Sequence, residues 1–317
     1  MKLARLVALV AAIALAATAC GGSGPVAGPG TGAGQGGGAG HIGARVAQLS
    51  FDGTTRSYRV YSPGAPTRVA RLPLVVVLGG VGDNAQSMTN ATLFDQEAGV
   101  GGFVVAYGEA AQASWSAGFC CAGPDSNAYD DVGYLNHLVD TVEADYPIDA
   151  SRLYAVGVSA GAMMAYRWAC ADPARVAGVG SVAGAMVLDS CQPTVPVSVI
   201  EIHGTADPLV PFTGGAISPD GVATAAAPSS AALVQRWASL DTCPGTAAVQ
   251  TAGVVTRSTW TGCARGSAVS LVAVQGGGHT WFAPGYGAVE GAVDATKEIW
   301  TFLSTHNRSS AGGTGGG

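Results

Sequence analysis

A serine between glycines is the residue whose surroundings most favour chemistry in this sequence. Gly157-Val158-Ser159-Ala160-Gly161 has the GxSxG form, but 48 glycines among 317 residues make that string alone weak evidence. Its context is more specific, because it follows an apolar run and precedes a stretch typical of a helix, as a nucleophile elbow requires. We therefore predict that Ser159 is a nucleophile and that the Ala160 N–H, at the helix start, stabilises an oxyanion. The alternative is a tight turn that needs the glycines and not the serine.

A serine of this kind works with a histidine base and an acid. In folds that carry the elbow, the acid follows the serine and the histidine follows the acid. Of the five histidines, only His279 stands after a suitable acid and on a predicted loop, past the apolar run 269–274. We predict that it is the general base. The others lie in the glycine-rich N-terminal segment, before the serine, before the acid or in the last predicted helix: His41, His137, His203 and His306.

Asp207 is the acid that this order favours. It stands just past the apolar run 197–202, and catalytic groups of open parallel sheets gather at the carboxyl ends of strands. An acid there would orient the imidazole and stabilise its cation. Four rivals also fit the order, but they lie in turns or at helix edges and are interpreted as caps: Asp172, Asp189, Asp220 and Asp241.

Alternating strands and helices would position these residues. A hairpin is predicted first, with strands at 47–51 and 57–61 around the turn Asp52-Gly53. Continuous apolar runs, typical of strands covered on both faces, follow at 74–78, 103–107, 153–156, 197–202 and 269–274. Helical stretches occupy 131–146, 160–171, 229–240 and 289–306. The alternation predicts an α/β fold: a mostly parallel sheet with helices on both faces.

The composition excludes several classes of function. The net charge is −6 with only 15 lysines and arginines, so there is no basic stripe for phosphates, and nucleic acid is not an expected partner. No HExxH sequence or Cys/His ligand spacing occurs, so neither a metal nor a cofactor is expected.

The N-terminus has the features of an export signal. Lys2 and Arg5 precede an apolar run at 6–17, and small residues then lead into Cys20, which resembles a bacterial lipobox. We predict a signal peptide at 1–19, lipidation of Cys20 and a membrane-anchored protein on the outer face of the cell. The alternative is an ordinary signal peptide and a secreted protein. A glycine-rich tether at 20–43, a catalytic domain at 44–308 and a flexible tail at 309–317 complete the predicted organisation.

Seven cysteines, less the lipidated Cys20, leave six for disulfides in an oxidising compartment. Cys243 and Cys263 flank one local segment and form the natural pair. A bridge between the adjacent residues Cys120 and Cys121 would be strained, so we expect them to pair with Cys170 and Cys191, in an order that stays open. The alternative is six buried free thiols.

Several motifs occur in an order that resembles the polyhydroxybutyrate depolymerase and feruloyl esterase family. They comprise the run 74–80, the segment 115–121, the elbow, the segment 203–212 and Gly276 to Trp281, together with the cysteine spacing. The resemblance implies an α/β-hydrolase fold and the triad Ser159, Asp207 and His279. It also implies hydrolysis of carboxylic esters, in a polyester or in feruloyl and acetyl groups on polysaccharide. A lipase or peptidase of the same fold is the alternative.

One departure from the family concerns the second oxyanion donor. The family has His-Gly where this chain has Gly79-Gly80. The donor is expected to be the N–H of Val81, which survives the change as a backbone group, although the loop is expected to be looser. The departure leaves a non-catalytic surface binding protein as a further alternative.

Four side chains near these motifs have weaker predictions. Trp115 and Trp281 are expected on loops at the mouth of the site, as an aromatic wall for substrate, and packing in the core is the alternative for both. Asp130 and Asp131 are interpreted as caps of the following helix rather than as paired catalytic carboxylates.

Overall fold

The computed structural model describes residues 41–64, 70–121, 129–218, 225–284 and 289–308. The predicted signal peptide 1–19, the predicted lipidation site Cys20, nearly all of the predicted tether 20–43, the tail 309–317 and Asp220 lie outside these ranges. The first strand begins at Gly43, one residue before the predicted domain start. No helix in the described ranges combines the length and the apolarity that crossing a membrane requires.

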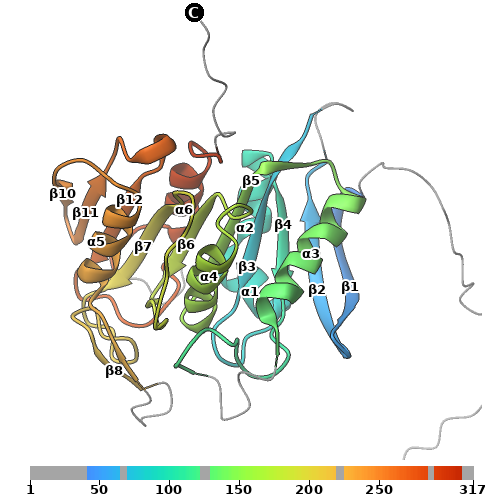
Figure 1. Ribbon diagram of the computed structural model, residues 1–317, viewed down its shortest axis with the longest axis horizontal. Coiled ribbons are helices and arrows are strands. Elements are labelled where there is room, and N and C mark those ends of the chain that lie inside the picture. The colour runs from blue at the N-terminus through green and yellow to red at the C-terminus, as the bar shows by residue number, and fades with distance from the viewer. Residues whose placement is uncertain (1–40, 65–69, 122–128, 219–224, 285–288, 309–317) are drawn as a thin grey trace, which may run out of the picture. The chain divides into compact units, whose positions relative to one another are not determined.

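A ten-stranded sheet forms the centre of the described fold, in the order β1-β2-β4-β3-β5-β6-β7-β12-β11-β10 (Figure 1). The six strands from β4 to β12 are parallel, and the strands at both edges are antiparallel. The predicted mostly parallel sheet with an opening hairpin is therefore confirmed. Its strands are β1 (Gly43–Phe51), β2 (Thr54–Ser62), β3 (Leu72–Leu78), β4 (Val104–Gly108), β5 (Ile148–Val158), β6 (Gly178–Val182), β7 (Ser198–Gly204), β10 (Ala248–Ala252), β11 (Val255–Trp260) and β12 (Val269–Val274). The short strands β8 (Gly215–Ile217) and β9 (Ala225–Ala227) form a separate pair.

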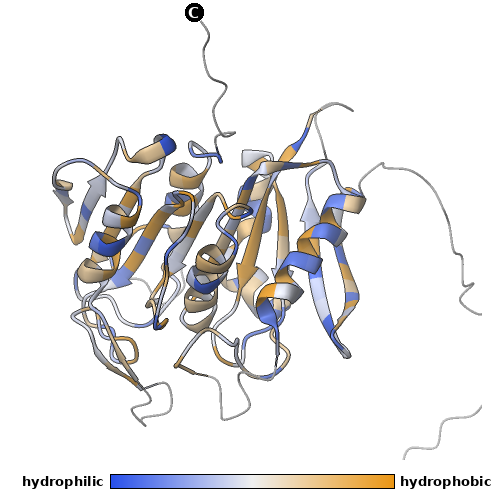
Figure 2. Cartoon of the chain, in the orientation of Figure 1, coloured by the Kyte–Doolittle hydropathy of each residue, from blue (hydrophilic) through white to orange (hydrophobic). Residues whose placement is uncertain are grey.

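Helices cover both faces of the sheet. One face carries α3 (Asp131–Asp145), α4 (Ala160–Ala171) and α5 (Ser230–Leu240), and the other carries α1 (Ala85–Thr92), α2 (Phe94–Gly101) and α6 (Ala295–Leu303) (Figure 1). The central strands separate two apolar cores, because alternate residues of β3 point to opposite faces: Leu74 and Val76 to one, Val75 and Val77 to the other. Figure 2 shows strands at the centre of the sheet in the orange of hydrophobic residues.

Glycines conceal β6 in the sequence, which predicts no strand there. This strand packs directly against α6, and a Cβ at Gly178 would lie 2.7 Å from Leu303 Cδ2. At Gly180, a Cβ would lie 2.7 Å from Ile299 Cγ2. The glycines therefore reflect close helix–sheet packing rather than a loop. The last helix also differs from its prediction, because it begins only at Ala295, where the Asp294 side chain caps it.

Three disulfides are present among the described residues, and they correct part of the predicted pairing. Cys243 is bonded to Cys263, as predicted. Cys170, near the end of α4, is bonded to Cys191 on the loop after β6, with the two Cα atoms 5.3 Å apart. Cys120 and Cys121 are therefore bonded to each other and not to that pair, so the expectation based on strain was wrong. The backbone accommodates the adjacent pair with Cys121 in a left-handed conformation, at φ 71°.

Candidate active site

Ser159 lies at the sharp turn between β5 and α4, with φ 54° and ψ −122°. A glycine would adopt a positive φ at less cost, so a serine here carries backbone strain of the kind that collects at functional sites. The two motif glycines have a packing role, since a Cβ on Gly161 would collide with the carbonyl oxygen of Leu78 and one on Gly157 would collide with Gly161 itself. A tight turn alone explains the glycines but not the serine.

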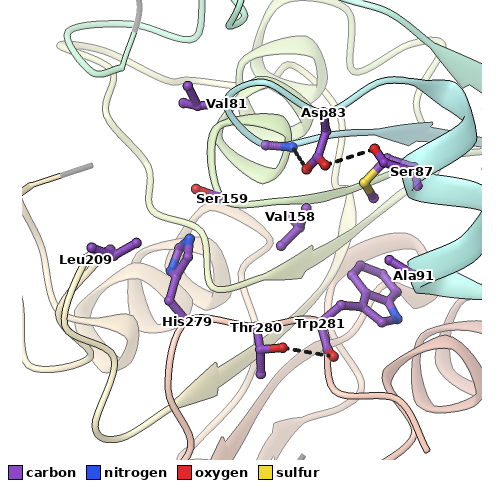
Figure 3. A pocket seen from close by; sticks show the side chains of 12 residues that line it. Val81, Asp83, Ser87, Ala91, Val158, Ser159, Leu209, His279, Thr280 and Trp281 are labelled. Atoms are coloured by element: carbon purple, nitrogen blue, oxygen red, sulfur yellow. Dashed lines mark hydrogen bonds between the residues drawn. The ribbon is translucent and has the colours of Figure 1, made fainter. Parts of the chain in front are cut away.

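Asp207 and His279 come together although 72 residues separate them. His279 Nδ1 lies 2.8 Å from Asp207 Oδ2, and the Asp207 side chain is fully buried. The other oxygen, Oδ1, accepts hydrogen bonds from the N–H groups of Leu209 and Val210, at 2.8 and 2.9 Å. Because an ionised carboxylate only accepts, the proton of His279 sits on Nδ1 and its Nε2 is left as an acceptor. Within the described residues, no hydrogen bond joins the Ser159 hydroxyl to His279, but both line one pocket (Figure 3).

A second histidine, His203, contacts Asp207 from inside the fold. Its Nε2 lies 2.8 Å from the carbonyl oxygen of Val210 and 3.3 Å from Asp207 Oδ2. Its Nδ1 lies 2.8 Å from Glu201 Oε1, and Tyr166 donates its hydroxyl to Glu201 Oε2 at 2.8 Å. A carbonyl oxygen can only accept, so Nε2 carries a proton, and the carboxylate of Glu201 holds a second one on Nδ1. His203 is therefore a buried cation between two carboxylates.

The charges in this cluster shift two pKa values in opposite directions. Burial by itself lowers the pKa of His203, but its hydrogen bonds with Asp207 and Glu201 outweigh burial and raise the pKa to about 10. For Asp207, burial alone raises the pKa, and the hydrogen bonds with His203 and His279 instead hold the pKa well below its usual range. Asp207 thus stays ionised and oriented toward His279.

The predicted oxyanion donor Val81 belongs to a turn over residues 80–83, called the oxyanion turn below, which lines the same pocket as Ser159. The Asp83 N–H donates to the Gly80 carbonyl at 3.2 Å, and Gly82 has the positive φ, 79°, that the third position of a type II turn needs. Gly82 N–H donates to Ala113 at 2.7 Å, and Gly80 N–H donates to the Asp83 carboxylate at 3.0 Å. In the part of the chain that the structure describes, Val81 is the residue of this turn whose N–H has no acceptor.

The pocket beside Ser159 has a volume of about 350 Å³. Ser159 and His279 share it with Val81 and Asp83 of the oxyanion turn and with Trp281 (Figure 3). The Trp281 ring packs edge-on against Phe94, and its Nε1 donates to Thr296 Oγ1 at 3.1 Å, which fixes the indole as part of the wall. The remaining lining residues are mostly small or apolar: Gly80, Ser87, Met88, Ala91, Val158, Leu209 and Thr280.

Trp115 does not lie at the mouth of the pocket, which corrects the sequence-based expectation. Only 1% of this residue is exposed, and its Nε1 donates to the Gly79 carbonyl at 3.0 Å. A tryptophan before a long loop was compatible with either a wall or the core, and packing against Tyr134 places it in the core. Trp115 is thus a core residue whose hydrogen bond holds Gly79, the residue just before the oxyanion turn.

Asp130 and Asp131 have structural roles. Asp130 caps α3 by accepting a hydrogen bond from the Gly133 N–H at 2.8 Å, as predicted. Asp131 is buried, pairs with Arg56 at 2.5 Å and accepts from the Ser116 N–H at 2.6 Å. It therefore ties the helix start to β2 and to the loop after β4.

Two residues of the site escaped the sequence analysis. Glu201 had a readable signal, because it is a lone carboxylate inside an apolar strand and stands two residues before a histidine. Asp83 had no such signal in the sequence. It bonds to the backbone N–H of Gly80 and the hydroxyl of Ser87, and both hydrogen bonds depend on how the loop folds.

Comparison with known proteins identifies the family. The family described as "Esterase PHB depolymerase" matches residues 56–236, more than half of the chain. The chain is 35% identical over 265 residues to "Putative esterase NocK" of Nocardia uniformis subsp. tsuyamanensis, covering 76% of each protein. It is 33% identical over 94 residues to "Probable feruloyl esterase C" of Aspergillus terreus, covering 30% of this chain and 35% of that protein.

A solved structure supports the fold. Acetyl xylan esterase from Aspergillus awamori has a TM-score of 0.56 with 13% identity, and the match covers 82% of this chain and 99% of that one. Such a likeness at low identity concerns the fold, and it agrees with the parallel sheet and its two helical layers. This chain therefore belongs to the PHB depolymerase family of esterases, and it is a carboxylic ester hydrolase with the α/β-hydrolase fold.

Proposed function

We propose that this esterase works by two-step acyl transfer, with Ser159, His279 and Asp207 as its catalytic triad. Ser159 Oγ attacks the ester carbonyl carbon while His279 Nε2 takes the hydroxyl proton. The N–H groups of Val81 and Ala160 bind the oxyanion, and the intermediate collapses as His279 returns the proton to the leaving alcohol. His279 then takes a proton from the water that attacks the acyl-enzyme, and it returns that proton to Ser159 Oγ as the acid is released.

The observation that carries this proposal is the hydrogen bond between Asp207 and His279 beside a strained serine in the same pocket. It supplies an oriented base with a free Nε2 next to a hydroxyl that protrudes from an elbow. The unengaged N–H of Val81 adds an oxyanion donor on the other side of the serine.

Ser159→Ala tests the mechanism directly. The variant is expected to lose at least about 10⁴-fold in kcat on a simple aryl ester and to lose labelling by a fluorophosphonate probe. Ser239→Ala, which removes an exposed hydroxyl from α5, is the matched control and is expected to keep both. Residual turnover within tenfold of the parent would remove Ser159 from the mechanism. A parent protein that neither reacts with the probe nor cleaves any ester would instead support a binding protein.

For the substrate, we propose an ester carried by a larger polymer, either a hydroxyalkanoate polyester or a polysaccharide with feruloyl or acetyl groups. The names of the relatives support this choice. The pocket, of about 350 Å³, accommodates one acyl group and not a polymer, so the rest of the polymer would stay outside it. A panel of aryl, acetyl, feruloyl and hydroxyalkanoate esters distinguishes these classes. Preference for long-chain triglycerides or for peptides would contradict the proposal.

Export on a lipidated Cys20 completes the proposed function. The lipobox-like sequence and the disulfides of the folded region support it. Cys20→Ser is expected to release the protein from the membrane fraction or to leave it as an unprocessed precursor, because the lipid thioether needs the sulfur. A variant that stays membrane-bound and correctly cleaved would contradict the lipid anchor.

A further inference from the structure

The carboxylate of Asp83 lies in the pocket wall, bonded to the turn that presents the Val81 N–H. From this placement we propose that Asp83 positions the oxyanion turn and makes the pocket discriminate against acyl groups that carry a negative charge. The proposal rests on the esterase mechanism given above and adds the charge class of the acyl group.

Asp83 closes the oxyanion turn with both of its carboxylate oxygens. Oδ2 accepts the Gly80 N–H at 3.0 Å, and Oδ1 accepts the Ser87 hydroxyl at 2.9 Å (Figure 3). The first bond occupies an N–H that would otherwise compete with Val81 as the oxyanion donor. The second fastens the turn to the first turn of α1, where Ser87 also forms part of the capping box with Asn84.

Gly79 makes this arrangement possible. A Cβ at position 79 would lie 2.5 Å from Asp83 Cβ and 3.2 Å from Met88 Cγ, so any larger residue would displace the aspartate. The glycine at position 79 and the placement of Asp83 therefore depend on each other. The loop that the sequence predicted to be looser is fastened by a side chain from the other end of the same turn.

The position of the carboxylate relative to Ser159 determines which part of the substrate it meets. In Figure 3, His279 lies on one side of Ser159, and Asp83, Ser87 and Ala91 lie on the other. The leaving alcohol must receive its proton from His279, so the acyl chain extends away from that residue and past Asp83. Among the described residues that line the pocket, Asp83 is the sole carboxylate, and no lysine or arginine is there to offset it. A negatively charged acyl group is therefore repelled, whereas a neutral or cationic group is accepted.

Matched esters measure this selectivity. The parent is tested with p-nitrophenyl esters of three acyl chains of similar length, ending in a methyl, a carboxylate or a trimethylammonium group. The parent is expected to favour the neutral and cationic esters over the anionic one by at least tenfold in kcat/KM, and added salt should reduce that ratio. A parent that hydrolyses all three equally would overturn the charge proposal while leaving the esterase mechanism intact. Failure to hydrolyse any of them would contradict the mechanism instead.

Two variants separate charge from position. Asp83→Asn keeps an acceptor for the Gly80 N–H and removes the charge, so the ratio of anionic to neutral kcat/KM should rise at least tenfold. That ratio is measured within one protein, so partial loss of folded enzyme does not affect it. Asp83→Ala removes both functions and should additionally lower kcat on the neutral ester relative to Asp83→Asn. Asp145→Asn, at the end of α3 beside the opposite end of β5, removes an equal charge far from Ser159 and should leave the ratio unchanged. If Asp83→Asn and Asp145→Asn give the same ratio, the selectivity does not come from Asp83.

Discussion

Different kinds of interaction hold the residues on the two sides of Ser159. On the acid–base side, fully buried charges hold Asp207, with two histidines on one oxygen and two backbone N–H groups on the other. On the oxyanion side, Val81 belongs to a turn at the surface, is 42% exposed, and owes its orientation to backbone hydrogen bonds and one exposed aspartate. The proposed base is thus oriented by a carboxylate that is buried from water, and the proposed oxyanion donor is oriented by local chain geometry.

The largest effect is expected from breaking the buried side at Asp207. In Asp207→Asn the amide can donate to His279 Nδ1, which favours the wrong tautomer of the base. We expect kcat to fall about 10⁴-fold on a neutral aryl ester. The fold should be retained by circular dichroism, although the free energy of unfolding should also fall, because His203 loses one of its two carboxylates. The control is Asp172→Asn at the end of α4, which alters an aspartate outside the triad. A loss of less than tenfold in Asp207→Asn would assign the acid role to another residue.

Removing the charge of Glu201, which pairs with His203 next to Asp207, tests whether electrostatics hold the acid–base side of the site. Glu201→Gln leaves His203 without one of its two carboxylates, and breaking a buried charge pair in this way should cost about 3–5 kcal/mol in the free energy of unfolding. The measurement is urea denaturation. Tyr166→Phe, which removes only the hydroxyl bonded to Glu201, should cost about 1–2 kcal/mol.

Glu201→Gln should also change how the free energy of unfolding depends on pH. The pKa of His203 is raised to about 10, so its stabilising contribution is complete below the ordinary histidine pKa and is lost as the pH rises through about 10. Glu201→Gln removes a cause of that shift, so its stability should fall less than that of the parent between about pH 7 and 10. Parallel curves for the two proteins would show that the Glu201–His203 pair does not titrate as described.

Val81→Pro breaks the oxyanion side without removing a charge. Val81 is the second residue of a type II turn, a position that favours proline, so the turn should survive while the N–H is lost. Loss of one oxyanion donor typically lowers kcat by about 10²–10³-fold. Val81→Ala keeps the N–H and should stay near the parent. Equal activity in the two variants would exclude Val81 as a donor.

The sequence was most informative where chemistry has a fixed order along the chain. Ser159, Asp207 and His279 were predicted from an elbow, a strand end and a loop, because each signal lies within a few residues of the side chain concerned. Most strands of the parallel part of the sheet followed from apolar runs, but β6 did not, because glycines required by contacts with α6 resemble a loop. The sequence analysis also predicted neither α1 and α2 nor the antiparallel strands β10 and β11. Position along the chain carried less information about the partners in space.

Residues whose role depends on distant neighbours could not be predicted. Trp115 is the same residue in a wall or in a core, and its bond to Gly79 decides between them. The partner of Cys170 depends on where the loop after β6 returns, which brings Cys191 within bonding distance. Asp83 acquires its place because a residue four positions earlier has no side chain. For Trp115 and Cys170 the deciding contact is tertiary, and for Asp83 it is the way the loop itself folds.

The smallest effect is expected at Asp241, a buried carboxylate that lacks the partners that Asp207 has. Its Oδ1 accepts the Val197 N–H at 3.2 Å, its Oδ2 has no partner among the described residues, and burial raises its pKa to about 6. A raised pKa means that its stabilising contribution is complete below about pH 4 and is lost as the pH rises through about 6, a loss of about 3 kcal/mol.

Asp241→Asn keeps the acceptor for Val197 and cannot ionise, although its new N–H groups lack an acceptor. We therefore expect the variant to exceed the parent by about 1–2 kcal/mol in free energy of unfolding at about pH 8 and to lose that advantage near pH 4. Urea denaturation at both pH values measures the difference. A variant less stable than the parent by the same amount at both would show that Asp241 is held by partners, as Asp207 is, and that burial alone does not distinguish the two carboxylates.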